Sequence, residues 1–133
     1  MSKEFPEFID DKWCFACGRE NPFGLKMDFE FLDDRVISTV VLDKKFQGFK
    51  DILHGGIVAL LLDEIMAWSV YKRGIKCATA KLELRLKKPV YTNVPVRVEG
   101  MVERKIKNTF VCRAFLCQDG IIKAEAKAIF VKV

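Results

Sequence analysis

Two neighbouring carboxylates, Asp63 and Glu64, stand in the middle of the most apolar stretch of the sequence, between Ile57 and Tyr71. Burying a charged carboxylate without a partner is unfavourable, so we expect carboxylates in this setting to have a functional or a structural role. One reason is chemistry, because a carboxylate in apolar surroundings can act as a base or as a nucleophile. The alternative for Asp63 is a structural carboxylate that pairs with a lysine.

The residues immediately before this stretch have a second chemical use. His54, Gly55 and Gly56 stand where the helical pattern begins, which places them at the first turn of a helix. The N–H groups of a first turn lack partners within the helix and can stabilise negative charge that develops on a bound carbonyl group. Glycine also lets a substrate approach the backbone closely.

One long helix must position these groups, because the side chains from Ile57 to Tyr71 are apolar around nearly the whole circumference. Such a helix has to be wrapped by other elements. Alternating apolar and polar residues predict strands that could wrap it, over residues 25–31, 35–42, 77–88, 95–105, 108–118 and 121–132. We therefore expect an α+β fold, with an antiparallel curled sheet of five to six strands around one central helix.

Length and composition favour a globular, water-soluble protein. The 133 residues are half hydrophobic and 31% charged, and we expect residues 1–133 to form a single domain with residues 1–24 as a leader packed on it. The N-terminal residues show no signal peptide, and the run Ile57–Leu62 is too short to span a membrane. Five cysteines, an odd number, predict a reduced cytoplasmic protein.

The charge is distributed unevenly along the chain. Residues 1–71 contain 8 Lys and Arg against 13 Asp and Glu, whereas residues 72–133 contain 15 against 5. A basic half could meet nucleic acid, a membrane surface or a small phosphorylated ligand. The alternative is a solvated outer face of the sheet, since these lysines alternate with apolar residues.

Cys14 and Cys17 form a Cys-x-x-Cys-Gly pattern that is half of a zinc ribbon. Zinc sites need four ligands and there is no second pair, so we expect no metal unless two subunits share a site. A redox pair is disfavoured because no thioredoxin-like context surrounds it. We expect Trp13, Phe15 and Phe23 to form a lid or packing plug with the two thiols, and we expect no cofactor.

The segment QGFKDILHGGIVALLLDE resembles the signature of hotdog-fold acyl-CoA thioesterases, in which a curved sheet wraps a helix. The resemblance is closest to the phenylacetyl-CoA-pathway and 4-hydroxybenzoyl-CoA thioesterases. It extends through LKMDFEF and RVISTVVL before the helix and through TAKLELRLKKPV and VRVEGMVERK after it, and CFACGRENPFGLKM is similar to a leader in one branch of the superfamily. It implies hydrolysis of an acyl-CoA to the free acid and coenzyme A.

The resemblance also implies roles for individual residues. Asp63, nine residues after His54, has the place of the family's catalytic carboxylate and would attack the carbonyl or activate water. N–H groups near Gly55 and Gly56 would polarise the thioester carbonyl. His54 would mainly hold the helix mouth in shape, with catalysis as the alternative. Glu64 points about 100° away from Asp63 around the helix, so we expect a structural role for it, bonded to a loop or to a neighbouring subunit.

Some positions depart from the family's pattern. Related aromatic-acyl thioesterases have a polar residue six positions before this histidine, where the present sequence has Gly48, and Gln47 one residue earlier is the candidate substitute. Ala67 stands where some relatives have threonine. For an apolar acyl pocket, Phe49 and Trp68 are candidates, together with Phe46 and Met66.

The coenzyme's phosphates require cationic partners. The candidates are basic residues near two strand ends: Arg85, Lys87, Lys88, Arg104, Lys105 and Lys107.

Relatives pair the strand equivalent to residues 77–88 across a two-fold axis, so we expect a homodimer or a dimer of dimers. We expect no nucleic-acid or membrane partner. The main alternative is a hotdog protein that binds acyl-CoA without hydrolysing it. Two further alternatives are a hydratase or dehydratase on the same fold and a nucleic-acid binder.

Overall fold

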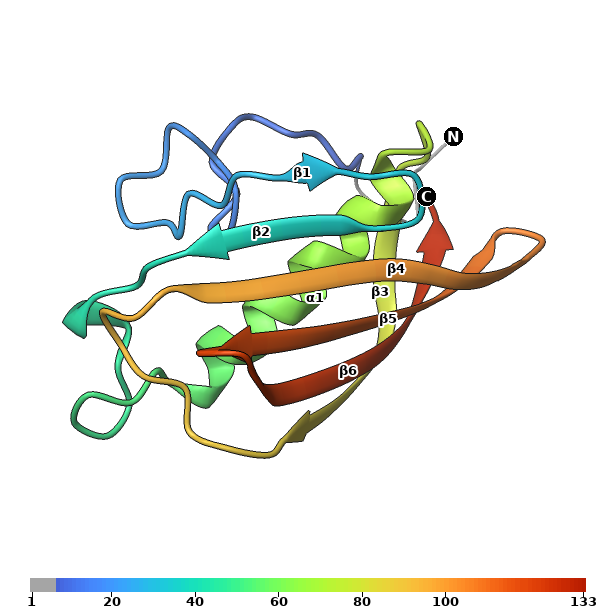
Figure 1. The fold of residues 1–133 in the computed structure, drawn as a ribbon. Helices are drawn as coiled ribbons and strands as arrows, with labels where there is room; N and C mark the ends of the chain where they lie inside the picture. Colours follow the sequence, from blue (N-terminus) through green and yellow to red (C-terminus); the bar gives the residue numbers. More distant parts are fainter. Residues whose placement is uncertain (1–6) are drawn as a thin grey trace.

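The computed structural model describes residues 7–133, so the first six residues of the predicted leader lie outside the described chain. One long helix, α1 (Gly55–Tyr71), is enclosed by a curled six-stranded sheet (Figure 1). The strands are β1 (Glu30–Phe31), β2 (Val36–Val40), β3 (Cys77–Leu86), β4 (Val96–Ile106), β5 (Thr109–Gln118) and β6 (Ile121–Lys132), and a short 3-10 helix spans Lys44–Phe46. This arrangement confirms the predicted α+β hotdog fold. None of the helices in the described range is both long and apolar enough to cross a membrane.

The strands are antiparallel throughout, in the order β1-β2-β4-β5-β6-β3. The last strand of the sequence, β6, therefore lies between β5 and β3, and β3 forms one edge of the sheet. Asp119 and Gly120 connect β5 to β6 in a two-residue turn, and both have positive φ angles. That turn is the hairpin that the Asp-Gly pair is typical of.

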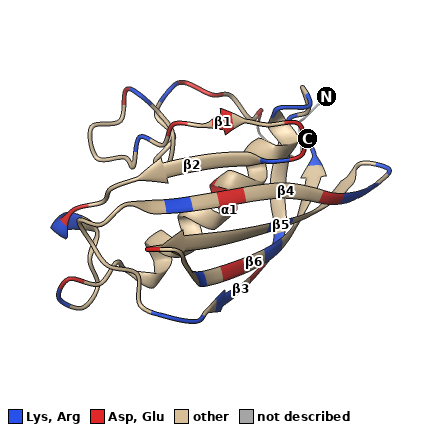
Figure 2. Ribbon diagram, in the orientation of Figure 1, with Lys and Arg blue, Asp and Glu red and all other residues tan. Residues whose placement is uncertain are grey.

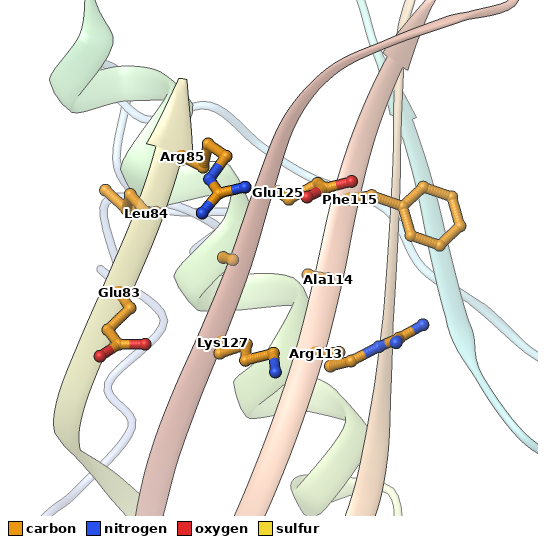
Figure 3. A pocket seen from close by; sticks show the side chains of 9 residues that line it. Glu83, Leu84, Arg85, Arg113, Ala114, Phe115, Glu125 and Lys127 are labelled. Carbon is orange, nitrogen blue, oxygen red and sulfur yellow. The ribbon is translucent and has the colours of Figure 1, made fainter. Parts of the chain in front are cut away.

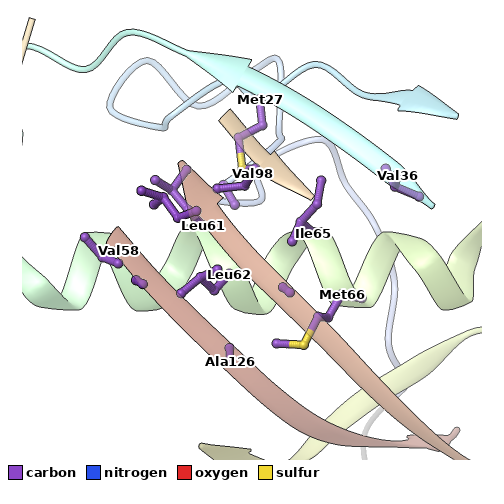
Figure 4. Close-up of a cluster of buried hydrophobic side chains, with 14 of the residues drawn as sticks. Met27, Val36, Val58, Leu61, Leu62, Ile65, Met66, Val98 and Ala126 are labelled. Carbon is purple, nitrogen blue, oxygen red and sulfur yellow. The ribbon is translucent and has the colours of Figure 1, made fainter. Parts of the chain in front are cut away.

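The core lies between α1 and the inner face of the sheet (Figure 4). Leu61, Leu62, Ile65 and Met66 of the helix are fully buried. Opposite them β6 contributes small residues, and Ala126 lies in the same cluster. Small side chains on β6 let the helix pack close to the strand.

The helix approaches the sheet closely at Gly100 of β4. A Cβ atom at this position would lie 2.7 Å from the carbonyl oxygen of Ile65. Because the obstacle is helix backbone rather than a flexible side chain, the two elements would have to move apart. We expect Gly100→Ala to lower the free energy of unfolding by about 1–3 kcal/mol, measured by denaturant titration. Glu103→Ala on the exposed part of β4 is the control, with an expected change within about 0.5 kcal/mol.

The predicted strand over residues 25–31 is wrong for most of its length, because only β1 (Glu30–Phe31) is a strand. The alternation itself is real, since Leu25 and Met27 are buried. Their N–H groups, however, donate to the carbonyl oxygens of Phe15 and Ala16 in the leader. Lys26 between them has a φ angle of 53°, which interrupts an extended backbone. The leader turn thus replaces a neighbouring strand as the partner.

The leader's aromatic side chains do not form the predicted packing plug. Trp13, Phe15 and Phe23 are all exposed, Phe23 by 73%. Ala16, whose exposed fraction is 1%, is a buried residue of this turn instead.

Candidate active site

Within the described part of the chain, the N-terminus of α1 presents one N–H donor that has no acceptor. His54 is the N-cap, and its Nδ1 accepts the Gly56 N–H at 2.8 Å. The His54 carbonyl oxygen accepts the N–H groups of Ile57 and Val58. Of the first-turn donors, only Gly55 N–H is left without an acceptor in residues 7–133, and the positive end of the helix dipole adds to its pull on negative charge.

A groove of about 660 Å³ opens beside this donor. Its walls come from the loop before α1, from the end of β3 and from the segment that follows β3. Apolar side chains dominate, and two lysines lie at the rim. The lining residues are Gly48, Phe49, Ile52, Leu53, His54, Gly55, Val58, Leu86, Lys87, Lys88, Pro89, Val90 and Ala124.

Asp63 lies two helical turns further along α1 and is half-buried. Its Oδ1 accepts a hydrogen bond of 2.8 Å from the Thr79 hydroxyl on β3. Burial raises the pKa of the Asp63 carboxyl above its ordinary value, and the bond from Thr79 opposes that shift. No Lys or Arg of the described chain forms an ion pair with Asp63, so the structure offers no lysine partner for a purely structural carboxylate.

The two groups do not meet within one chain. Gly55 and Asp63 are eight residues apart, which is about 12 Å along a helix. Asp63 is also absent from the groove lining.

The edge strand β3 lies beside both groups. Thr79, near its first end, holds Asp63, and Leu86 at its last end lies against Gly55. From Thr79 to Leu86 every residue of β3 is exposed, including the apolar Leu82 and Leu84. A long, exposed and partly apolar edge strand is a surface on which a second strand can pair.

Comparison with known proteins assigns the chain to a family. Residues 50–125, more than half of the chain, match the family model described as the thioesterase superfamily. The chain belongs to the thioesterase superfamily. No curated protein sequence matches it.

Solved structures agree with this assignment. A thioesterase superfamily protein of known crystal structure is 25% identical to this superfamily member, with a TM-score of 0.85 over 98% of this chain and 69% of the other. A phenylacetic acid degradation-related protein from Ralstonia eutropha JMP134 is also 25% identical, with a TM-score of 0.74 over 82% and 86% of the two chains. A hypothetical thioesterase protein from Streptococcus pneumoniae TIGR4, solved with coenzyme A, shares the fold at 17% identity, with a TM-score of 0.76 over 80% and 88%.

In this superfamily member the predicted binding residues are only partly gathered at the groove. Gly48, Phe49, Lys87 and Lys88 line it. Gln47 precedes it in the same loop, where its Oε1 accepts the N–H of Asp51 at 3.0 Å.

Trp68 lies elsewhere, in an aromatic cluster near the end of α1. Its ring packs on those of Phe29, Phe31 and Tyr71, with a centroid distance of 4.8 Å to Phe29. Phe46 and Met66 are core residues. Of the four apolar candidates, Phe49 alone reaches the groove.

The basic candidates are likewise dispersed, and Figure 2 shows Lys and Arg on several separate segments. Arg85 lies on the outer face of the sheet, in a hollow with charged residues of β5 and β6 (Figure 3). Arg104 and Lys105 lie just before the hairpin from β4 to β5. The strand register places this hairpin at the same end of the sheet as the start of β3. The groove lies at the opposite end of β3, beside Leu86.

One contact of the site is not marked by any pattern in the sequence. Thr79 was not a candidate, because its contact with Asp63 joins a helix to a strand and no spacing marks it. Glu64 faces the leader rather than the sheet edge, and its Oε2 lies 3.5 Å from the sulfur of Cys14.

Proposed function

We propose that this superfamily member hydrolyses an acyl-CoA thioester to the free acid and coenzyme A. One observation carries the proposal: a helix N–H without an acceptor in residues 7–133 opens onto an apolar groove, while a half-buried carboxylate without a cationic partner in the same range lies beside the same edge strand. Membership of the thioesterase superfamily supports thioester hydrolysis as the reaction. The streptococcal structure with coenzyme A supports that carrier.

The Gly55 N–H would polarise the carbonyl. With the acyl group in the groove, the carbonyl oxygen accepts this N–H and develops negative charge at the positive end of α1. Gly56 N–H is already bound by His54, so Gly55 is the stronger candidate of the two. In this proposal His54 holds the first turn of α1 in place as its N-cap and takes no proton during the reaction.

Asp63 would supply the second function. Thr79 fixes its Oδ1, which leaves Oδ2 to face the substrate. The carboxylate either attacks the carbonyl carbon, forming an anhydride that water then cleaves, or takes a proton from a water molecule that attacks directly. In both routes the carbon–sulfur bond breaks and coenzyme A leaves as the thiolate. The proton released from water passes to that thiolate or to solvent, and Asp63 is again a carboxylate.

Two chains would complete each site. Antiparallel pairing of two β3 strands about their middle brings the Thr79 end of one strand opposite the Leu86 end of the other. Asp63 of the partner subunit then faces Gly55 across the two-fold axis. We therefore propose a homodimer, alone or as half of a dimer of dimers.

Substrate contacts follow from the groove lining. Phe49, which is 85% exposed, would cover the acyl group. Lys88 has no ion pair among residues 7–133 and is the first candidate for a phosphate contact, whereas Lys87 is bound to Glu125 at 2.8 Å. Arg85, Arg104 and Lys105 would contact the coenzyme only from another subunit.

The proposed setting is the cytoplasm, with no nucleic-acid or membrane partner. All five cysteines are free thiols, which supports a reducing compartment.

A thiol-release assay tests the reaction. The purified chain is incubated with a panel of short, long and aromatic acyl-CoAs, and coenzyme A is trapped by a chromogenic disulfide. We expect saturable release for at least one acyl class and none with heat-denatured protein. Tight binding of acyl-CoA by calorimetry without thiol release for any member of the panel would favour the non-catalytic alternative.

A further inference from the structure

Glu64 and two leader cysteines form a cluster that the proposed reaction does not use. The Glu64 carboxylate and the sulfurs of Cys14 and Cys17 all lie within 4.8 Å of one another, and all three residues are half-buried. The residues come from segments about fifty positions apart in the sequence. No Lys or Arg in residues 7–133 forms an ion pair with Glu64, so this carboxylate has no positive charge beside it.

One distance within the cluster, that of the hydrogen bond from the Cys14 thiol to Glu64, also suits two ligands of a tetrahedral metal ion. Zinc binds sulfur at about 2.3 Å and carboxylate oxygen at about 2.1 Å, which places sulfur and oxygen about 3.6 Å apart in a tetrahedron. Cys14 Sγ and Glu64 Oε2 are 3.5 Å apart. Thiolates select soft ions such as zinc over magnesium or calcium, which prefer oxygen.

The backbone around the two thiols is held firmly. Gly18 N–H donates to the Cys14 carbonyl oxygen at 2.8 Å, closing the turn that contains both cysteines. Gly18 has no room for a side chain, because a Cβ atom there would lie 2.4 Å from the backbone nitrogen of Cys14. The bonds from Leu25 and Met27 to this turn fix it further. The backbone that carries the two thiols is therefore held in place before any ion binds.

We propose that Cys14, Cys17 and Glu64 bind one zinc ion, with water as the fourth ligand, and that this ion ties the leader to α1. The sequence shows only two neighbouring thiols, which are too few ligands for zinc. The fold adds the Glu64 carboxylate as a third protein ligand. The proposal also accounts for two adjacent carboxylates in an apolar helix. Asp63 is bonded to Thr79 at the sheet edge and is the candidate catalytic carboxylate. Glu64 would bind the zinc ion on a different side of the helix.

Metal analysis of the full chain, purified without a histidine tag and under reducing conditions, tests this site. We expect about one zinc per chain by mass spectrometry after incubation with zinc chloride and gel filtration. Replacement by cobalt chloride should give thiolate-to-cobalt charge-transfer absorption. Glu64→Gln, Cys14→Ser and Cys17→Ser should each weaken zinc binding at least about 100-fold in a chelator competition. Cys117→Ser is the control, a partly buried cysteine outside the cluster, and should keep one zinc.

Glu64→Gln is nearly isosteric, so it reports on the ligand even if a cysteine variant fails to fold. Zinc below about a tenth of an ion per chain, or cobalt without the charge-transfer band, would overturn the proposal. Zinc affinity unchanged in Glu64→Gln would overturn the ligand set. A metal-free chain in which Cys14 and Cys17 form a disulfide on mild oxidation would make the pair a redox element instead.

Discussion

Asp63→Asn should lower kcat for thioester hydrolysis by about 10²- to 10⁴-fold while leaving the fold intact. The amide keeps the shape of the carboxylate and can still accept the Thr79 hydroxyl, but it can neither attack a carbonyl nor take a proton from water. Stability should be unchanged or higher, because a partly desolvated charge is removed. Steady-state thiol release and circular dichroism measure the two effects.

Asp119→Asn is the matched control for this substitution. Asp119 is exposed in the turn between β5 and β6, at a positive φ angle that asparagine accepts well. It should keep wild-type turnover. If Asp63→Asn also kept it, the catalytic carboxylate would have to be sought elsewhere.

Mixing two inactive variants should restore about a quarter of wild-type activity. Asp63→Asn removes the carboxylate, and Gly55→Pro removes the N–H that faces the groove. A mixed dimer holds one intact site, formed by Gly55 of the first chain and Asp63 of the second. Random exchange makes half of the dimers mixed, each with one of two sites intact, which gives the expected quarter.

The structure suits the proline variant. Proline is tolerated at the first position of a helix, and His54 before it has an extended ψ of 135°, as a residue before proline requires. Gly55→Ala keeps the N–H and should stay far more active than Gly55→Pro. Light scattering verifies the dimer, and fluorescence labelling of the two variants verifies exchange. Parents that stay inactive after confirmed exchange would show that the site does not form between chains.

Much of the fold was predictable because its signals are local. The helix over 55–71 follows from an apolar pattern that begins at glycines and ends before Gly74, and the strands after it follow from alternation and one Asp-Gly turn. Residues 25–29 show the limit of that reasoning. Alternation predicts which side chains are buried, but not whether the backbone partner is a strand or, as here, the turn at Phe15 and Ala16.

The site was predictable only where the sequence neighbours of a residue are also its spatial neighbours. Phe49 and His54 fall at the groove because one short loop carries both. Trp68, five residues beyond Asp63, lies in an aromatic cluster because β1 crosses that end of the helix. The contacts of Asp63 with Thr79 and of Glu64 with Cys14 depend on how strands and leader return to α1, which no local pattern encodes.

The position of β6 between β5 and β3 has a consequence for how the protein is made. On the ribosome β3 is complete about 35 residues before β6 begins, and among the strands of residues 7–133 it has no other partner within its own sheet. During synthesis the hairpin of β4 and β5 can form, but β3 stays unpaired until β6 is available. Thr79 and Leu86 therefore reach their places beside Asp63 and Gly55 only when β6 has been synthesised. A nascent chain released before that point would carry every candidate catalytic residue and still have no assembled site.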